Sequence, residues 1–343
     1  TGELLAEGIG KDEIIEKLND CINNSGHSLV PDFRLLWPYT NIGTKKDYVY
    51  AMNIEGSWYK DEENPEAMFQ FCVSHLGSSS DSNRINQYVG IRARPKGDYL
   101  TNGFPFGQGY GWITVNPHLY NNWYNEEPDD IRRDASIWNV AVEGNETYTW
   151  GNENQVQESG LWQKKYQAYG FIAEDGSFWK EFGSLAEYGG PGNYDLSRKY
   201  SLQNLQMIRF ADVLLMHSEI SKTADKMNEV RARVGLAPVA YSEEAIRMER
   251  RHELAFEAVR WGDLRRYGKE YAKAALAAQK GGLVKHEGGE FVEQKEVGPG
   301  WAKRYEDTYG FFPIPQSEID LSAGAMKQNA GWTGTDHSYT GIK

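Results

Sequence analysis

The sequence lacks most of the features that mark specialised classes of protein. Only two of its 343 residues are cysteines, Cys21 and Cys72, which excludes a disulfide scaffold and leaves a single bridge open. It contains no run of about 18 apolar residues, the length that a membrane-spanning helix needs. Basic residues are too few to balance the acids, and the net charge of −12 argues against a nucleic-acid or anionic-membrane partner.

Residues that carry catalytic or metal chemistry are present, but they form no recognisable site. None of the seven histidines lies at metal-ligand spacing from another. His252 and Glu253 begin a zinc-protease pattern, but its second histidine should stand where the sequence has Phe256. The acidic pairs at 126–127 and 129–130 suit a glycosidase only if the fold brings the two required carboxyls together. We therefore expect no catalytic residue, no metal and no cofactor, while an irregular calcium site stays open.

Aromatic residues, in contrast, are abundant. They make up 13% of the chain, with 11 tryptophans and 21 tyrosines, in a composition that is 40% hydrophobic and 25% charged. Such values are typical of a globular protein, and 343 residues suffice for a sizeable core. Most rings belong in that core, but the number also indicates a surface on which a ligand stacks.

The clearest helical signal is the stretch SEEAIRMERRHELAFEAVRWGDLRRYG, from Ser242 to Gly268. Ser242 is a favourable N-cap, and Gly268 can end a helix in the left-handed conformation. We expect one long buried helix here, with Trp261 in the core and with glutamate–arginine pairs along the helix.

Other segments show weaker periodicity. We expect a buried helix from Leu202 to Ile220, in which Arg209 and Asp212 pair with each other or with arginines of the Ser242 stretch. Ala224 to Val234 should form the next helix. The segment AMFQFCVSH, residues 67–75, is expected to be a buried strand.

Three blocks in the same order resemble the SusD/RagB family: residues 204–219, residues 249–268 and residues 311–332. The family comprises surface lipoproteins of Bacteroidota that capture nutrients for a TonB-dependent transporter. The resemblance implies a mainly α (α+β) SusD-like fold with tetratricopeptide-like helical pairs. It also implies that residues 1–200 form a loop-rich ligand-binding lobe and residues 201–343 the C-terminal helical region.

The resemblance further implies a function. The protein is expected to be a surface-exposed outer-membrane lipoprotein that delivers a glycan or oligosaccharide to a SusC-like TonB-dependent transporter, and not an enzyme. Peptide capture is the alternative within the family, because a net charge of −12 suits cationic peptides; a glycoside hydrolase is a weaker alternative. The family normally starts with a signal peptide and a lipid-modified cysteine. We therefore expect the lipid anchor, and an N-terminal part of the family fold, to lie before Thr1.

We place the ligand site in the loops between residues 84 and 123. Tyr110 and Trp112 lead as stacking residues, since they lie in glycine-rich loop and not on a periodic face. Side-chain amides nearby can both donate to and accept from sugar hydroxyls. The candidate ligand-binding residues are Tyr110, Trp112, Asn102, Gln108, Trp123 and Trp58, of which the last two are rivals of Trp112.

Overall fold

The computed structural model of the chain divides into two compact units. It describes residues 8–37, 59, 63–73, 83–91, 109–143, 148, 150, 158–167, 169–172, 179–182, 203–286, 288–296 and 300–332. For residues 86, 169–172 and 179–182 it describes the backbone alone. The larger unit comprises residues 8–258 and 284–292, and the smaller one includes residues 259–283 and those from 293 onward. The larger unit therefore contains residues on both sides of position 200.

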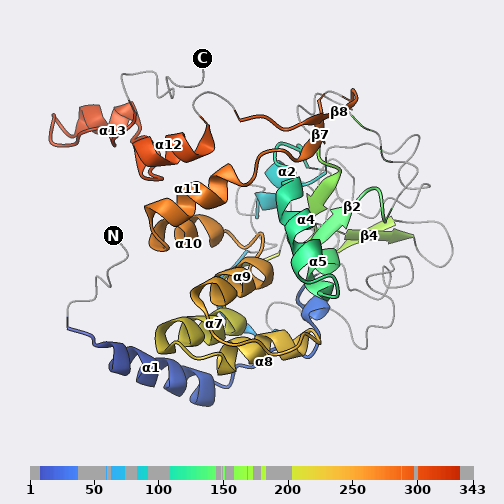
Figure 1. Cartoon of the computed structure of the whole chain (residues 1–343), viewed down its shortest axis with the longest axis vertical. Helices are drawn as coiled ribbons and strands as arrows, with labels where there is room; N and C mark the ends of the chain where they lie inside the picture. Colours follow the sequence, from blue (N-terminus) through green and yellow to red (C-terminus); the bar gives the residue numbers. More distant parts are fainter. Residues whose placement is uncertain are drawn as a thin grey trace. The chain divides into compact units, whose positions relative to one another are not determined.

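The described part of the larger unit is rich in helices and short strands (Figure 1). The helices are α1 (Lys11–Asn24), the 3-10 turn η1 (Phe33–Leu36), α2 (Ile85–Val89), α4 (Pro117–Glu126), α5 (Ile131–Ser136), α7 (Phe210–Ser221), α8 (Asp225–Arg233) and α9 (Glu243–Glu253). The antiparallel strand pairs are β1 (Ala67–Phe71) with β6 (Leu205–Arg209), β2 (Ile137–Asn139) with β3 (Leu161–Gln163), and β4 (Tyr169–Ile172) with β5 (Trp179–Phe182). The expected mainly α (α+β) class is confirmed.

Helix α7 is the centre of a group of packed helices, because it contacts α1, α8 and α9 (Figure 1). It joins α8 through residues 222–224, where Lys222 adopts a left-handed φ of 63°. Ser218 Oγ accepts from the backbone N–H of Met227 at 2.8 Å, which fixes the start of α8 against the end of α7. The short turn makes the two an antiparallel helical hairpin. The helix predicted over 224–234 is confirmed.

The single long helix predicted from Ser242 to Gly268 is wrong. Ser242 does cap its start, accepting from the N–H of Ala245 at 3.0 Å, but α9 ends at Glu253. Phe256 and Ala258 then take left-handed φ values of 67° and 63°. The carbonyl of Glu253, which would continue the helical ladder, instead accepts from Lys165 Nζ at 3.0 Å and from Arg209 Nη2 at 3.1 Å. Tertiary hydrogen bonds therefore end this helix about four turns earlier than predicted.

The helix predicted from residue 202 also begins later than expected, because residues 205–209 form strand β6. The backbone of this segment pairs with β1, and the N–H of Phe210 donates to the carbonyl of Glu66 at 2.8 Å. A neighbouring strand thus overrides the helical pattern. The predicted strand at 67–75 exists but is shorter and not buried, since Phe69 and Phe71 are 61% and 62% exposed.

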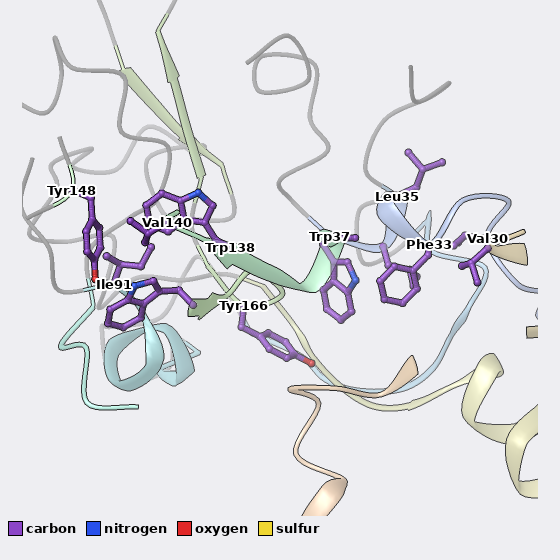
Figure 2. Packing of buried hydrophobic residues seen from close by; sticks show 13 residues of the cluster. Val30, Phe33, Leu35, Trp37, Ile91, Trp138, Val140, Tyr148 and Tyr166 are labelled. Carbon is purple, nitrogen blue, oxygen red and sulfur yellow. Dashed lines mark hydrogen bonds between the residues drawn. The ribbon is translucent and has the colours of Figure 1, made fainter. Parts of the chain in front are cut away.

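The main apolar core of the larger unit is built around large rings (Figure 2). It joins η1 to β2 and β3, with Phe33, Trp37, Trp138 and Trp162 all essentially inaccessible. Trp37 meets Tyr166 edge-on, with ring centroids 5.6 Å apart. The core accounts for many of the aromatic residues, as expected from the composition.

Cys21 and Cys72 of the larger unit are free thiols, so they do not form the disulfide bridge that the sequence left open. Glu158 is fully buried and accepts from the hydroxyl of Tyr148 at 3.2 Å. No described helix has the combined length and apolar character that crossing a membrane requires.

The smaller unit contains α10 (Arg260–Arg266), α11 (Lys269–Ala277), α12 (Trp301–Thr308) and α13 (Gln316–Leu321). Helix α11 packs against both α10 and α12 (Figure 1). Trp261, predicted as a core residue, is 38% exposed, so this prediction is wrong. It lies in the first turn of α10, and its indole N–H donates to the carbonyl of Gly310 at 3.0 Å. Strands β7 (Leu283–Lys285) and β8 (Phe291–Glu293) form another pair, and most of their residues belong to the larger unit.

Candidate functional site

Three aromatic side chains gather where the short helix α2 meets the segment 109–112. Each of the four residues of this segment donates its backbone N–H to a carbonyl of residues 87–91, at 2.7 to 3.1 Å. These bonds occupy carbonyls at the end of α2 that have no partner within the helix. Gly111 adopts a φ of 63°, a left-handed conformation that suits glycine. The pairing brings Tyr88, Tyr110 and Trp112 together although residues 92–108 separate the two segments.

We call these three residues the aromatic cluster. The rings of Tyr110 and Trp112 are nearly parallel, with centroids 5.3 Å apart and an interplanar angle of 26°. The Tyr88 ring lies 5.4 Å from that of Trp112 and 6.4 Å from that of Tyr110. Trp112 is 69% exposed and Tyr88 is 38% exposed. The cluster is therefore a surface that keeps ring faces open to solvent.

The cluster is fixed to the larger unit on both sides. Asn83 is buried before α2; its side chain donates to the carbonyl of Gln203 at 3.0 Å and accepts from the N–H of Ile85 at 2.9 Å. On the other side, the N–H of Val115 donates to the carbonyl of Leu161 in β3 at 2.9 Å. Ring positions that are fixed before a ligand arrives reduce the entropy cost of binding.

The structure brings together some of the predicted ligand-binding residues and separates another. Tyr110 and Trp112 are neighbours in the cluster, whereas Asn102, Gln108 and Trp58 lie outside the described residues. Tyr88 was not selected from the sequence. No local pattern identifies it, because its place depends on the pairing of residues 87–91 with residues 109–112.

Trp123 lies in the interior and offers no ring face at the surface. It is fully buried, and its indole N–H donates to Asp130 Oδ2 at 2.9 Å. Its ring stacks on the imidazole of His252, with centroids 4.3 Å apart and planes within 5°. We therefore leave Trp123 out of the proposed ligand surface.

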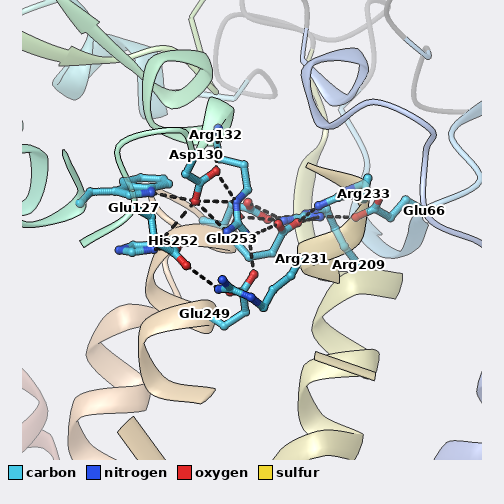
Figure 3. A network of polar contacts seen from close by, with 12 residues as sticks. Glu66, Glu127, Asp130, Arg132, Arg209, Arg231, Arg233, Glu249, His252 and Glu253 are labelled. Carbon is cyan, nitrogen blue, oxygen red and sulfur yellow. Dashed lines mark hydrogen bonds and ion pairs between the residues drawn. The ribbon is translucent and has the colours of Figure 1, made fainter. Parts of the chain in front are cut away.

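A buried network of ion pairs holds the larger unit together (Figure 3). Arg209, at the end of β6, binds both carboxylate oxygens of Glu257 at 2.7 and 2.9 Å and also pairs with Glu66 and Glu253. Arg233 of α8 binds the same two partners, Glu66 at 2.9 Å and Glu253 at 2.5 Å. The buried Glu253 and Glu257 of the Ser242 stretch thus pair with arginines of other elements. Of the glutamate–arginine pairs expected along the helix itself, Glu243 with Arg247 is present, at 3.7 Å.

The network continues to α5. Arg132, which is fully buried, binds Asp130 at 2.7 Å, Glu249 at 2.5 Å and Glu253 at 3.0 Å. Glu253 therefore receives three guanidinium groups. Burial disfavours its charge, but the three arginines outweigh this and hold the pKa of Glu253 far below its ordinary value. The expected partner for Asp212 is confirmed, since it binds Arg250 of α9 at 2.5 Å.

Among the described residues, one group has the composition of a metal site: Glu127, Asp130 and His252. The two carboxylates already accept from cationic side chains, Glu127 from Arg231 at 2.6 Å and Asp130 from Arg132 at 2.7 Å. Burial raises the pKa of Asp130, but Arg132 and the Trp123 indole outweigh burial and lower it. The group is best understood as the outer end of the ion-pair network.

Two adjacent lysines are buried beside this network. Lys165 binds Glu257 at 2.6 Å, and Lys164 binds Glu143 at 2.8 Å. Burial lowers the pKa of each lysine to about 8, although its glutamate partner acts in the opposite direction. Both ammonium groups also donate to backbone carbonyls, Lys165 to that of Glu253 at 3.0 Å. These lysines fasten β3 to α9 and to the end of α5.

The fold is similar to that of several solved proteins. A laminarin-binding SusD-like protein matches with a TM-score of 0.60 at 21% identity, over 94% of this chain and 59% of that one. Surface glycan-binding protein A from Bacteroides thetaiotaomicron matches with 0.58 at 18% identity, over 93% and 59%. Its complex with laminarihexaose matches with 0.56 at 18% identity, over 93% and 60%. The chain spans about three fifths of the length of these structures.

Comparison of the sequence with those of known proteins and protein families identifies the family of the chain. None of the curated proteins compared with the chain matches it. The sequence model of the SusD family, in contrast, matches residues 65–332, which is well over half of the chain and includes all three blocks that resembled the SusD/RagB family. The chain belongs to the SusD family.

Proposed function

We propose that this chain captures oligosaccharides at the cell surface and delivers them to a SusC-like TonB-dependent outer-membrane transporter. The observation that carries the proposal is the aromatic cluster, in which Trp112 is 69% exposed beside two tyrosines. A soluble protein gains nothing for its fold from a tryptophan that remains in water. Exposed apolar groups that are clustered, and not scattered singly, mark interaction sites.

The geometry of the cluster suits a sugar. The C–H groups on one face of a pyranose carry partial positive charge and are attracted to the negative face of an aromatic ring. Tyr88 and Tyr110 add phenolic hydroxyls, which donate to and accept from sugar hydroxyls. Asn102 and Gln108 remain proposed hydrogen-bonding residues, and Trp58 remains a proposed stacking residue. The two solved relatives named above are described as glycan- or laminarin-binding, which supports the same ligand class here.

Two of the carboxyls that were considered for hydrolysis, Glu127 and Asp130, lack the property that a general acid needs. A glycosidase needs a general acid whose pKa is raised. Burial acts in that direction on Glu127, but His252 and Arg231 outweigh it and lower the pKa. The pKa of Asp130 is lowered as well. Both groups therefore stay ionised at neutral pH and cannot donate a proton to a leaving group.

Membership of the family supports the proposed site of action and the proposed partner. The proposed location is the outer face of the outer membrane, with attachment through a lipid anchor. A transporter partner would take up the captured oligosaccharide, so the protein itself needs no catalytic residue. The net charge of −12 also favours cationic peptides, and peptide capture is therefore the second candidate function.

One experiment separates these functions. The purified chain is screened on an array of oligosaccharides that includes laminarihexaose, and in parallel against a library of cationic peptides. Binding to one class of glycan, with the glycan recovered intact after long incubation, is the expected result. Binding to peptides alone would show that the protein captures peptides and not glycans. Release of shortened glycans would show that the protein is an enzyme. Co-purification from native membranes in mild detergent tests the partner; recovery of the native protein without a transporter contradicts that part.

A further inference from the structure

The smaller unit contains a pocket that the proposed function does not use. It has a volume of about 270 Å³ and lies between α10, the end of α11, α12 and the segments that follow α12. Its walls are mainly aromatic, and the rings that form them are Trp261, Trp301, Tyr305, Phe311, Phe312 and Trp332. Phe311 and Phe312, which are 47% and 74% exposed, place the opening at the protein surface.

Three polar atoms in the pocket walls already have partners within the chain. The indole N–H of Trp261 donates to the carbonyl of Gly310, and that of Trp332 to the carbonyl of Phe311, both at 3.0 Å. Thr308 Oγ1 donates to a carbonyl of the preceding turn at 2.9 Å. A sugar hydroxyl beside these three atoms would give up its water without gaining an equivalent hydrogen bond from them, which is unfavourable. An apolar group would lose nothing of this kind.

The rim of the pocket is positively charged. The guanidinium of Arg265 lies 4.1 Å from the centroid of the Phe311 ring, and that of Arg304 lies 4.6 Å from the centroid of the Trp332 ring. Arg265 is exposed, and none of the described carboxylates forms an ion pair with it. In a chain of net charge −12 the Arg265 guanidinium favours an acidic group at the rim.

We propose that this pocket binds one apolar side chain, aromatic or leucine-sized, of a partner polypeptide that carries a carboxylate next to it. Pockets for small ligands usually exceed about 300 Å³, so this one has room for a side chain and not for an oligosaccharide. Aromatic residues and arginine together are the composition enriched where a few residues dominate the affinity of a protein–protein contact. The aromatic cluster belongs to the other unit, so the two sites can be tested separately.

The test uses capped peptides and the full chain labelled with nitrogen-15 at the tryptophan indoles. The probes are Gly-Asp-Trp-Asp-Gly, its lysine-flanked counterpart Gly-Lys-Trp-Lys-Gly and the truncated Gly-Asp-Ala-Asp-Gly, each added to millimolar concentration. The indole signals of Trp261 and Trp332, assigned from Trp→Phe variants, should shift and saturate with the first peptide. The other two peptides should shift them less at equal concentration.

Two variants complete the design. Phe312→Ala removes a largely exposed ring, so the fold should persist, and the affinity for the acidic peptide should fall at least about fivefold. Arg265→Glu should weaken the binding of the same peptide, so that it no longer binds more tightly than the lysine-flanked peptide. Trp112→Ala, in the other unit, should bind the acidic peptide as the native chain does.

Several results would overturn the inference. One is the absence of a saturable shift with the acidic peptide. Another is equal binding of the acidic and lysine-flanked peptides, or an undiminished affinity in folded Phe312→Ala. Laminarihexaose that shifts the Trp261 and Trp332 indoles when the peptide does not would make the pocket a sugar subsite instead. None of these results concerns glycan binding at Trp112, so failure of one proposal is distinguishable from failure of the other.

Discussion

Replacing Glu253 by glutamine should destabilise the larger unit more than any other single change of one carboxylate to its amide. Glu253 is fully buried and pairs with Arg132 at 3.0 Å, with Arg209 at 3.0 Å and with Arg233 at 2.5 Å. The amide keeps the shape of the side chain but removes its charge. It also points N–H groups at guanidinium donors, so hydrogen bonds are lost together with the charge.

The expected loss of stability depends on the buried arginine charges that remain when Glu253 loses its charge. Removing one partner of a buried ion pair costs about 3–5 kcal/mol, because the opposite charge is left uncompensated. The three arginines keep other partners, Glu66, Glu249 and Glu257 among them, which brings the expected loss to the lower part of that range, about 3 kcal/mol. Glu244, exposed on the first turn of the same helix, supplies the control: Glu244→Gln should cost less than about 1 kcal/mol.

Urea unfolding followed by circular dichroism measures both variants, and the dependence on pH gives an independent check. The folded-state pKa of Glu253 lies far below its ordinary value of 4.5. The unfolded chain therefore takes up the proton first as the pH falls. The stability that this group contributes is complete above about pH 4.5 and is lost as the pH falls further. A lower pH should consequently reduce the difference in unfolding free energy between the native and the Glu253→Gln proteins. A Glu253→Gln protein as stable as Glu244→Gln would refute the reasoning.

Three further changes test other parts of the structure. Lys165→Met should reduce the rise of unfolding free energy with pH between about 8 and 10.5, since the depressed folded pKa makes the unfolded chain hold more protons there; urea titrations at pH 7.5 and 9.5 check this. Asn83→Ala removes both bonds that hold α2 and should cost about 1–2 kcal/mol while also weakening glycan binding in calorimetry. Trp261→Ala should cost about 1–3 kcal/mol, less than a fully buried tryptophan, because the ring is 38% exposed; thermal unfolding measures it.

The start of α9 was predicted from the sequence better than its end. Ser242 caps α9 as expected, because a cap involves only neighbouring residues. The end of α9 depends on Lys165 and Arg209, which take the carbonyl of Glu253 from elements far away in the sequence. A left-handed φ at Phe256 has no signal in the sequence, since phenylalanine rarely adopts it.

The candidate site was predictable to a similar extent. Trp112 stands in glycine-rich loop, and such a loop has no periodic apolar face, so its exposure could be expected. Trp123 lies on a helix, and its burial against His252 is set by α9. Tyr88 became part of the site only through the pairing of α2 with residues 109–112. Long-range pairing of this kind leaves no periodicity in a single sequence.

The central claim is that the aromatic cluster binds sugar, and calorimetric titration of Trp112→Ala tests it most directly. The titrant is the oligosaccharide that binds best in the array, and Phe312→Ala, which removes a comparably exposed ring from the smaller unit, is the matched control. Loss of one stacking ring should weaken the affinity of Trp112→Ala by about 0.5–1.5 kcal/mol, roughly two- to tenfold. The control should bind as the native chain does. An unchanged affinity in a Trp112→Ala protein with a native thermal midpoint would contradict the account.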